Sequence, residues 1–286
     1  MTIGFIGQGW IGKNYADNFE SRGFRVVRYA LEKPYFKNRA GIKSCDIVFI
    51  AVPTPTTPRG FDASIIDKVI SLVGKGKIAV IKSTVTPGVT EKIQKEHSNI
   101  TVLHSPEFLV ESTARYDTDN PTRNIIGIPY KSSKHKSAAK KVLRVLPKAP
   151  IEITCLSKES EFIKYAANGL LYAKVVFANL LYDLAESLDC DWRVVKQGVT
   201  ADPRVGKTHL DPIHKSRPGV RPGRGAGGHC FIKDFAALKK IYGNVVGEKI
   251  GLRVIEALER KNNNLLLSSN KDVELLRGVY GKKVPH

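Results

Sequence analysis

The 286-residue sequence contains little cysteine and no long apolar run. Its four cysteines, at positions 45, 155, 190 and 230, form neither a Cys-x-x-Cys pair nor any spacing of metal ligands, so no metal site is expected. This pattern excludes a disulfide scaffold and predicts reduced thiols in the cytoplasm. The most apolar stretch, 169–185, is interrupted by Lys174 and Asp183, which predicts a buried helix and no membrane span. Met1 leads directly into a strand-like stretch, so no targeting segment is expected.

Acidic residues are also scarce, with 27 Asp and Glu against 46 Lys and Arg, and the formal net charge is +19. Such an excess favours contact with polyanions, either nucleic acid or nucleotide phosphates. The basic residues gather in 131–148, in 196–224 and in the tail, without the interleaved aromatic residues of a platform for single-stranded nucleic acid. We interpret the charge mainly as a solvated surface that favours phosphate, and nucleic acid is not expected as a partner.

The beginning of the chain has the pattern of a dinucleotide-binding fold. An apolar strand over 2–7 leads into a G-x-G-x-x-G motif that opens an amphipathic helix. The glycines permit a tight turn and a close backbone approach, and the helix N-terminus faces pyrophosphate. The residues expected to contact the cofactor here are Gly7, Gln8, Gly9, Trp10, Ile11 and Gly12.

The second strand of such a fold should end in an acidic residue that binds the ribose. Ala30 stands near that position, with Arg28 before it and Glu32 after it. Glu32 could take the place of the missing acid, or Arg28 and Lys33 could favour a 2′-phosphate. NAD is therefore the expected cofactor, and NADP stays open.

Strands continue to alternate with helices up to residue 154. Further strands are expected at 45–52, 77–82, 99–104, 124–128 and 150–154, with helices such as 62–73 and 132–145 between them. We therefore predict an α/β fold, a doubly wound Rossmann-like parallel sheet over residues 1–154. From Lys158 the periodicity becomes helical, with one long apolar helix over 160–188. Residues 155–286 are predicted to form a helical dimerisation domain that carries a cysteine loop.

Four glycines within the six residues 223–228 precede Cys230. Glycines leave this backbone free to adopt positive φ and to approach a ligand closely. A glycine loop that leads to a thiol suits a nucleophile that must be accessible in a pocket. A glycine-rich surface turn with an incidental cysteine is the alternative interpretation.

Seven motifs together resemble the UDP-glucose/GDP-mannose dehydrogenase family. In chain order they are Gly7-Gln-Gly-Trp-Ile-Gly12, Val52-Pro-Thr-Pro-Thr56, Ser83-Thr-Val85, Ser105-Pro-Glu-Phe-Leu-Val-Glu111, Lys164-x-x-x-Asn168, Asp202-Pro-Arg-Val-Gly206 and Gly225-Ala-Gly-Gly-His-Cys-Phe-Ile-Lys-Asp234. They follow the family's order and cover residues 1 to about 262. The resemblance implies an NAD-dependent enzyme that oxidises the 6-hydroxyl of a nucleotide sugar to give the uronic acid. UDP-glucose is the nucleotide sugar expected first as the substrate.

The resemblance also implies roles for individual residues. The Cys230 thiolate would capture the aldehyde formed by a first oxidation, so that a second oxidation gives a thioester that water releases. Lys164 and Asn168 would stabilise an oxyanion, and Glu111 would activate the water. The expected catalytic set is Cys230, Lys164, Asn168, Asp234, Glu111, Glu107 and Thr84. Further cofactor contacts are expected from Thr54, Thr84, Glu111 and Lys233, and substrate contacts from Phe108, Leu109, Lys164, Asn168, Arg204 and Gly227. Arg204 would reach the neighbouring subunit's site, which implies a homodimer.

The sequence departs from the family's pattern in three places. The segment 31–44 is shorter, the segment around 211–220 lengthens the connection between Arg204 and Cys230, and the family's second nucleotide-binding domain does not follow the last helices. Whether the sugar carrier is UDP or GDP therefore stays open. Basic side chains near the cysteine could replace some phosphate contacts, namely Lys215, Arg217, Arg221 and Arg224.

Two other functions remain as alternatives. A dehydrogenase of the 3-hydroxyisobutyrate/6-phosphogluconate type also joins a dinucleotide fold to a helical part with a Lys-x-x-x-Asn helix, but performs one oxidation without a cysteine. A non-catalytic relative could instead bind nucleic acid through its basic surface. The Ser105-Pro-Glu-Phe and Gly228-His-Cys motifs favour the nucleotide-sugar enzyme.

Overall fold

The computed structural model describes residues 1–286 and contains two compact units. Unit 1 comprises Met1–Pro55 and Asp62–Lys164, and unit 2 comprises Thr56–Phe61 and Tyr165–His286. None of the helices combines the length and the apolar character needed to cross a membrane. The domain boundary predicted after residue 154 stays a prediction.

Unit 1 is built on a seven-stranded sheet in the order β2-β1-β3-β6-β7-β8-β9. Its strands are β1 (Thr2–Ile6), β2 (Arg25–Tyr29), β3 (Ile47–Ile50), β6 (Ile78–Ile81), β7 (Thr101–His104), β8 (Arg123–Ile128) and β9 (Ile151–Leu156). All neighbouring strands are parallel except β7 and β8, which run antiparallel. The predicted Rossmann-like sheet is therefore confirmed as a mostly parallel one.

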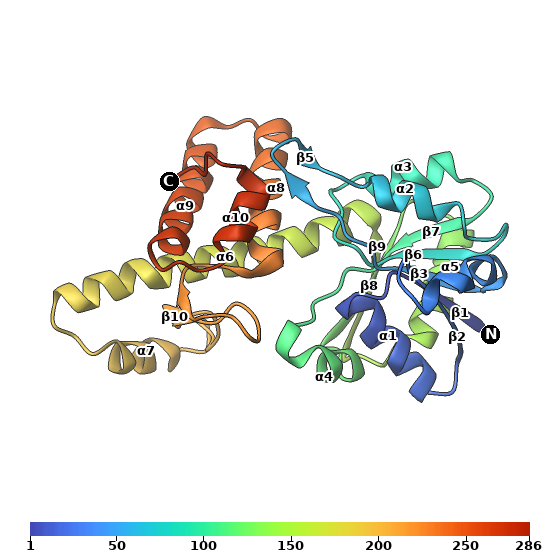
Figure 1. The fold of residues 1–286 in the computed structure, drawn as a ribbon, viewed down its shortest axis with the longest axis horizontal. Coiled ribbons are helices and arrows are strands. Elements are labelled where there is room, and N and C mark those ends of the chain that lie inside the picture. The colour runs from blue at the N-terminus through green and yellow to red at the C-terminus, as the bar shows by residue number, and fades with distance from the viewer. The chain divides into compact units, whose positions relative to one another are not determined.

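The helices of unit 1 are α1 (Trp10–Ser21), α2 (Ser64–Ile70), α3 (Val89–Glu96), α4 (Ala114–Asp119) and α5 (Ser133–Val145), with 3₁₀ helices η1 (Tyr35–Ser44) and η2 (Glu111–Thr113). Helix α1 lies on one face of the sheet and α2 and α3 lie on the other (Figure 1). This division follows from right-handed crossovers, because the chain moves from β1 towards one edge and from β3 towards the other. The strand order thus reverses between β1 and β3, where ligands of such sheets bind.

Aromatic rings fill the core beneath α1. Phe5 of β1 stacks on Phe49 of β3 with the ring centroids 5.2 Å apart, and Phe19 of α1 packs against both rings. All three side chains are fully buried. Offset and edge-on ring pairs of this kind add to the free energy gained by burial. The packing fixes α1 against the strand ends that carry the glycine motif.

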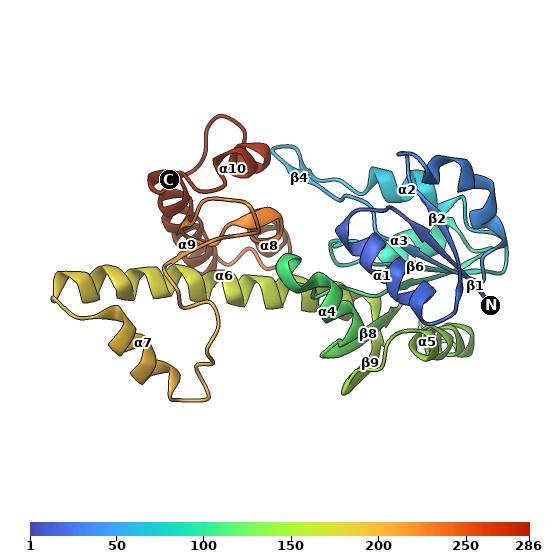
Figure 2. The same cartoon turned by 60° about the horizontal axis from the view of Figure 1, so that its bottom comes forward.

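Unit 2 is helical. It contains the 31-residue α6 (Ser157–Ser187), whose first eight residues belong to unit 1, and then α7 (Trp192–Thr200), α8 (Gly228–Val245), α9 (Lys249–Ser268) and α10 (Val273–Tyr280). Two short hairpins complete it, β4 (Thr56–Thr57) with β5 (Gly60–Phe61) and β10 (Ile213–His214) with β11 (Gly223–Arg224). Helix α7 turns back beside the C-terminal half of α6 (Figure 2). Trp192 of α7 packs edge-on against Tyr182 of α6.

The centre of unit 2 lies between α6 and α8. Tyr172 of α6 stacks on Phe235 of α8 with a centroid distance of 3.8 Å, and Val175 and Val176 extend the same cluster. The long helix predicted over 160–188 is thus confirmed. Helix α8 begins at Gly228, so Cys230, which was expected on a glycine loop, lies in the first turn of a helix.

Candidate active site

The glycine motif at the end of β1 is closely packed in a way that side chains would prevent. Gly7 adopts a φ of +91°, and a Cβ atom there would lie 2.2 Å from the carbonyl oxygen of Ala51. A Cβ atom at Gly12 would lie 2.0 Å from the carbonyl oxygen of Gly7. A Cβ atom at Gly9 would have no other atom within 4 Å. The motif therefore combines a tight turn with an open side that faces the N-terminus of α1.

The N-terminus of α1 is suited to an anion. Gly9 occupies its N-cap position, no side chain caps the helix, and the first turn contains no acidic residue. The first N–H groups of a helix lack partners within the helix, and the helix dipole favours negative charge there. Gln8 and Ile11 flank this end, and Trp10 is the first helical residue. The structure thus brings the predicted cofactor residues of this motif together at one strand end.

The next strand ends contribute two threonines. Thr54 is buried after β3, and its hydroxyl donates to the carbonyl oxygen of Thr84, which follows β6, over 2.7 Å. Ser83 holds the same two segments together, because its hydroxyl accepts from the Val52 N–H at 3.0 Å. The two threonines predicted as cofactor residues therefore lie side by side at the switch point of the sheet.

The residues considered for contact with the ribose or with a 2′-phosphate differ in whether their side chains are exposed or bound within unit 1. Arg28 is bound to carboxylates of α1, at 2.7 Å to Asp17 and 2.6 Å to Glu20, and its side chain is largely buried. Its charge is thus already compensated within unit 1. Glu32 is exposed after β2. Lys33, which was considered together with Arg28 for a 2′-phosphate, is also exposed. Arg28 is therefore engaged within unit 1, whereas Glu32 and Lys33 are both accessible after β2.

Glu107 and Lys164 form a buried ion pair within unit 1. The lysine Nζ donates to the Glu107 carbonyl oxygen at 2.9 Å and lies 3.3 Å from Oε1. Both side chains are at most 5% exposed. Glu107 Oε2 also accepts from the Leu109 N–H at 2.8 Å, which holds the carboxylate in place. Lys164, which is expected from the resemblance to stabilise an oxyanion, thus has the Glu107 carboxylate as one partner.

The second glutamate of this segment has different surroundings. Glu111 is exposed at the start of η2, whereas Glu107 is buried directly after β7. Phe108, between them, lies under the guanidinium of Arg123 at 3.7 Å from its ring centroid. Leu109 is half-buried and packs against the core of the sheet. The structure therefore places the four predicted residues of this segment at one edge of unit 1, with only Glu107 shielded from solvent.

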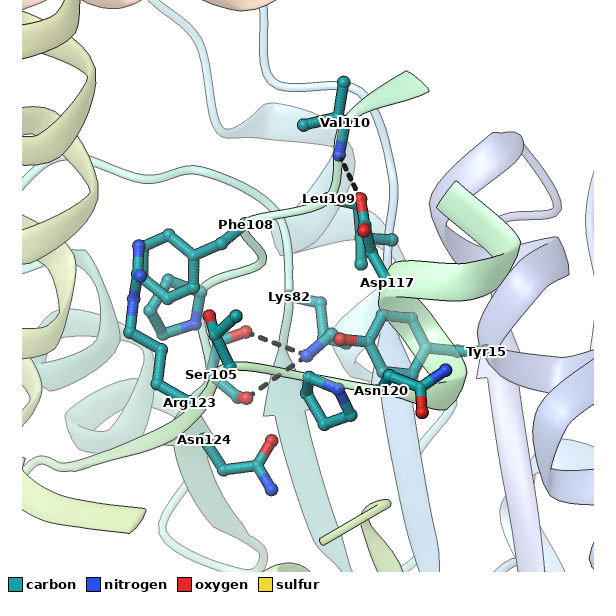
Figure 3. Close-up of a pocket in the computed structure, with 13 residues that line it drawn as sticks. Tyr15, Lys82, Ser105, Phe108, Leu109, Val110, Asp117, Asn120, Arg123 and Asn124 are labelled. Carbon is teal, nitrogen blue, oxygen red and sulfur yellow. Dashed lines mark hydrogen bonds between the residues drawn. The ribbon is translucent and has the colours of Figure 1, made fainter. Parts of the chain in front are cut away.

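A cavity of about 220 Å³ opens beside this segment, and sequence reasoning missed the lysine inside it (Figure 3). Lys82 directly follows β6, donates to the carbonyl and hydroxyl oxygens of Ser105, and lies 4.3 Å from the ring centroid of Tyr15. Burial lowers its pKa to about 8. The sequence pattern that could have identified Lys82 is its position directly after the apolar run 78–81 and directly before Ser83. Lys82 fixes Ser105, two residues before Glu107.

In unit 2, three predicted residues are linked across α6 and α8. Asn168 Nδ2 donates to Asp234 Oδ2 at 2.6 Å, and Lys233 Nζ lies 2.6 Å from Asp234 Oδ1. Asp234 is 2% exposed. Cys230 lies one helical turn before Asp234, on the same side of α8, and is half-buried. The cysteine, the carboxylate and the amide thus share one region of unit 2.

Arg204 and Gly227 also belong to unit 2. The Arg204 side chain is 88% exposed and pairs with Asp202 at 2.6 Å. Lys174 of α6 donates to the carbonyl oxygens of Val205 and Gly206, at 2.8 and 3.2 Å, and so anchors the turn that carries Arg204. Sequence reasoning identified Lys174 only as an interruption of the apolar stretch. Gly227 has no room for a side chain, because a Cβ atom would lie 2.2 Å from Asp272 Oδ2.

Two of the four basic residues considered for phosphate binding are engaged elsewhere. Arg224 binds Asn179 and Asp183 of α6, and Arg217 contacts His229. Lys215 and Arg221 are exposed. Lys215 and Arg221 therefore remain as the candidates for the additional phosphate contacts.

Comparison with known protein families gives two matches. The NAD-binding domain of the UDP-glucose/GDP-mannose dehydrogenase family matches residues 34–146, and the central domain of the same family matches residues 158–264. The UDP-glucose 6-dehydrogenase of Rickettsia conorii is 33% identical over 92% of this chain and 66% of its own length. UDP-glucose 6-dehydrogenase YwqF of Bacillus subtilis is 32% identical over 85% of this chain and 54% of its own. The chain thus spans about half to two thirds of the length of these curated relatives.

Solved structures agree in fold. A UDP-glucose dehydrogenase from Pyrobaculum islandicum has a TM-score of 0.78 at 27% identity and covers 96% of this chain, which covers 70% of that one. The 3-hydroxyisobutyrate dehydrogenase of Mycobacterium tuberculosis has a TM-score of 0.71 at 16% identity, with 95% and 96% of the two chains covered. The second likeness concerns the fold alone.

Proposed function

The chain belongs to the UDP-glucose/GDP-mannose dehydrogenase family, and from this membership we propose that it oxidises UDP-glucose to UDP-glucuronate in an NAD-dependent four-electron reaction at Cys230. The observation that carries the proposal is the Asn168–Asp234 hydrogen bond, with Cys230 one turn earlier on α8. A thiol, a carboxylate and an amide in one region are the groups that acyl chemistry on a cysteine requires. The cytoplasmic location predicted from the cysteines is part of the proposal.

The glycine motif fits NAD. Gly7 and Gly12 pack where any side chain would collide with backbone, while Gly9 leaves open space before the uncapped N-terminus of α1. A pyrophosphate requires this combination of close backbone and free N–H groups. The residues that would hold the cofactor are Gly7, Gln8, Gly9, Trp10, Ile11, Gly12, Thr54 and Thr84, with Glu111 and Lys233 as further candidates.

Two oxidations at one carbon atom need a covalent step between them. The first removes a hydride and a proton from the primary alcohol, and the Cys230 thiolate adds to the carbonyl carbon of the aldehyde. The thiohemiacetal has a C–H bond, so a second hydride can leave and a thioester forms. Water attacks the thioester, the C–S bond breaks, and the acid leaves with the thiolate restored. NAD, when bound, would supply the hydride acceptor that both oxidations require.

The buried Lys164–Glu107 pair supports a role in proton transfer. A lysine beside a carboxylate can stabilise an oxyanion, and the carboxylate can accept a proton from water. Glu107 is shielded and oriented by the Leu109 N–H, whereas Glu111 is exposed. We therefore propose Glu107 as the base for thioester hydrolysis and Glu111 as a contact of the cofactor. Asn168 and Asp234 would complete the oxyanion and water contacts.

The surface of α6 supports a homodimer. Five large apolar side chains of this helix are more than 40% exposed, and four of them lie 7, 3 and 4 residues apart in unit 2, namely Leu170, Phe177, Leu180 and Leu184. An apolar stripe of this length marks a protein–protein interface. The exposed Arg204, on the turn that Lys174 anchors, would then contact the partner's substrate.

Counting NADH tests the reaction. The protein is incubated with NAD and a limiting amount of UDP-glucose, GDP-mannose or another nucleotide sugar, and absorbance at the nicotinamide band is followed to completion. Two NADH per sugar are expected from the wild type, and one or none from Cys230→Ser. Cys190→Ser is the matched control, because this exposed thiol lies outside the proposed site. One NADH per substrate, unchanged in Cys230→Ser, would instead support the single-step hydroxyacid enzyme.

A further inference from the structure

The glycine segment before Cys230 is bound on its inner side by polar side chains that are remote in sequence. Lys271 is 2% exposed, and its Nζ donates to the carbonyl oxygens of Gly225 at 2.8 Å and Gly223 at 3.2 Å. Its remaining contact is His214 Nε2 at 3.0 Å. A lysine this deeply buried is found only where its ammonium has specific partners. Here those partners are backbone carbonyls of the segment itself.

The His214 contact has a defined proton arrangement. His214 Nδ1 lies 2.9 Å from the carbonyl oxygen of Asp211, which can only accept, so Nδ1 carries the hydrogen and Nε2 accepts from Lys271. Burial and the neighbouring Lys271 charge both lower the pKa of His214, which favours this neutral form. His214 lies in the 211–220 segment that lengthens the connection relative to the family.

Asp272 binds the segment at its other end. It occupies the N-cap position of α10, but its side chain caps no N–H of that helix. Its Oδ2 accepts instead from the Gly228 N–H at 2.8 Å, at the start of α8. Gly227, the N-cap of α8, has no side chain to satisfy that group. A carboxylate 44 residues further along the chain therefore caps the helix that carries Cys230. Two charged groups face this carboxylate, Arg217, whose Nη1 lies 4.0 Å from Oδ1, and Lys271, which interacts with it electrostatically.

Asn262 of α9 completes the contacts between these two ends. Its Oδ1 accepts from the Ala226 N–H at 2.7 Å, and its Nδ2 donates to the Ala226 carbonyl oxygen at 3.1 Å. Asn262 is fully buried. Backbone groups at 223, 225, 226 and 228 are thus all fixed by side chains of α9 and of the turn before α10.

We propose that Lys271 and Asp272 are positioning residues for Cys230, which hold the glycine segment and the first turn of α8 in the geometry that presents the thiol. The catalytic part of this proposal rests on the proposed function, in which Cys230 is the nucleophile. A glycine-rich backbone has the largest conformational freedom to lose, so without external bonds the segment would be mobile. A cysteine in the first turn of an ordered helix also gains from the N-terminal N–H groups, which favour the reactive thiolate.

The test uses the full chain and two readouts that do not depend on turnover. In Lys271→Met, amide hydrogen exchange should become about 5-fold faster in peptides covering 223–230 and stay unchanged in 165–187. Alkylation of Cys230 by iodoacetamide should become about 3-fold slower relative to Cys190 in the same molecule. Lys249→Met, at an exposed position of α9, should alter neither. If Lys271→Met does not fold, His214→Leu, which removes only the third lysine contact, should show smaller changes of the same direction.

Exchange and alkylation that match the wild type would overturn the proposal. So would faster exchange throughout unit 2 with a lowered melting temperature, because Lys271 would then act on stability alone. Absence of NADH formation by the wild type would refute the proposed reaction but leave the exchange and alkylation results valid. The two proposals can therefore fail separately.

Discussion

Asn168 Nδ2 lies 2.6 Å from Asp234 Oδ2, and this hydrogen bond joins the long helix α6 to the helix that carries Cys230. The other oxygen of the same carboxylate pairs with Lys233. One buried carboxylate therefore orients an amide and an ammonium at once. Removing its charge should affect both partners without removing a side chain's volume.

Asp234→Asn tests this relationship directly. We expect kcat/KM for NADH formation with UDP-glucose to fall by about 100-fold, because a positioned acid or base contributes on that order. Asp67→Asn, an exposed carboxylate of unit 1, should leave the rate unchanged. Equal rates for Asp234→Asn and the wild type would show that the carboxylate has no part in the reaction.

The glycine motif predicts two different outcomes for two similar substitutions. Gly12→Ala places a Cβ atom 2.0 Å from the Gly7 carbonyl oxygen, so we expect a loss of about 1–3 kcal/mol in unfolding free energy. Gly9→Ala meets no atom within 4 Å and should fold as stably as the wild type, but it should weaken NAD binding. Thermal unfolding and a titration of NAD against tryptophan fluorescence measure the two effects. An unaltered NAD affinity in Gly9→Ala would argue against the cofactor's phosphates at this turn.

Lys82 predicts a pH dependence of stability. Its pKa is about 8 in the folded protein and near 10.4 when exposed, so between these values the unfolded chain binds more protons. Stability should therefore rise with pH in this window, by about 1.4 kcal/mol per unit at its steepest, and the penalty for burying the charge is fully present below pH 8. Lys82→Met should remove this slope, measured as the difference from the wild type in denaturant unfolding at pH 7–10.

The prediction concerns the difference between Lys82→Met and the wild type in how unfolding free energy changes with pH. Burial also lowers the pKa of Lys271 to about 8, so this second lysine contributes a pH dependence of its own in both proteins. Lys75→Met serves as the matched control, since this side chain is exposed. A wild-type slope that persists in Lys82→Met would mean that the Lys82 ammonium stays hydrated.

The apolar stripe on α6 predicts the oligomeric state. Phe177→Glu places a charge among Leu170, Leu180 and Leu184, and we expect it to shift a dimer to a monomer in sedimentation velocity. Leu31→Glu changes an even more exposed leucine of unit 1 and should leave the dimer intact. A wild-type protein that sediments as a monomer at micromolar concentration would contradict the assignment of this surface.

The fold was predictable from the sequence because its local signals agree. Short apolar runs such as 45–52 are typical of strands buried on both faces, and the glycine motif fixes the first turn. The antiparallel pairing of β8 was not foreseen, since strand direction depends on the path of α4 and not on strand composition. The start of α8 was also missed. Residues 225–228, Gly-Ala-Gly-Gly, have the composition of a loop, and the side chain that caps the helix there is Asp272, 44 residues after Gly228.

The candidate site was predictable where residues share a motif and not where they meet through the fold. Glu107 and Lys164 were both identified, but their pairing joins positions 57 residues apart. Lys82 was missed because a lysine after a strand usually reaches solvent, whereas here Tyr15 and Ser105 enclose it. Burial of a charge cannot be seen until the covering elements are known.

Lys174 has a consequence for anyone who redesigns this chain for heat tolerance. Substitution tables would favour leucine there, because the surrounding helix is apolar and leucine has a high helix propensity. The ammonium, however, is bonded to the carbonyl oxygens of Val205 and Gly206. A more stable helix would then be obtained at the cost of releasing the loop that displays Arg204, and in the proposed dimer this would impair the contact of Arg204 with the partner's substrate.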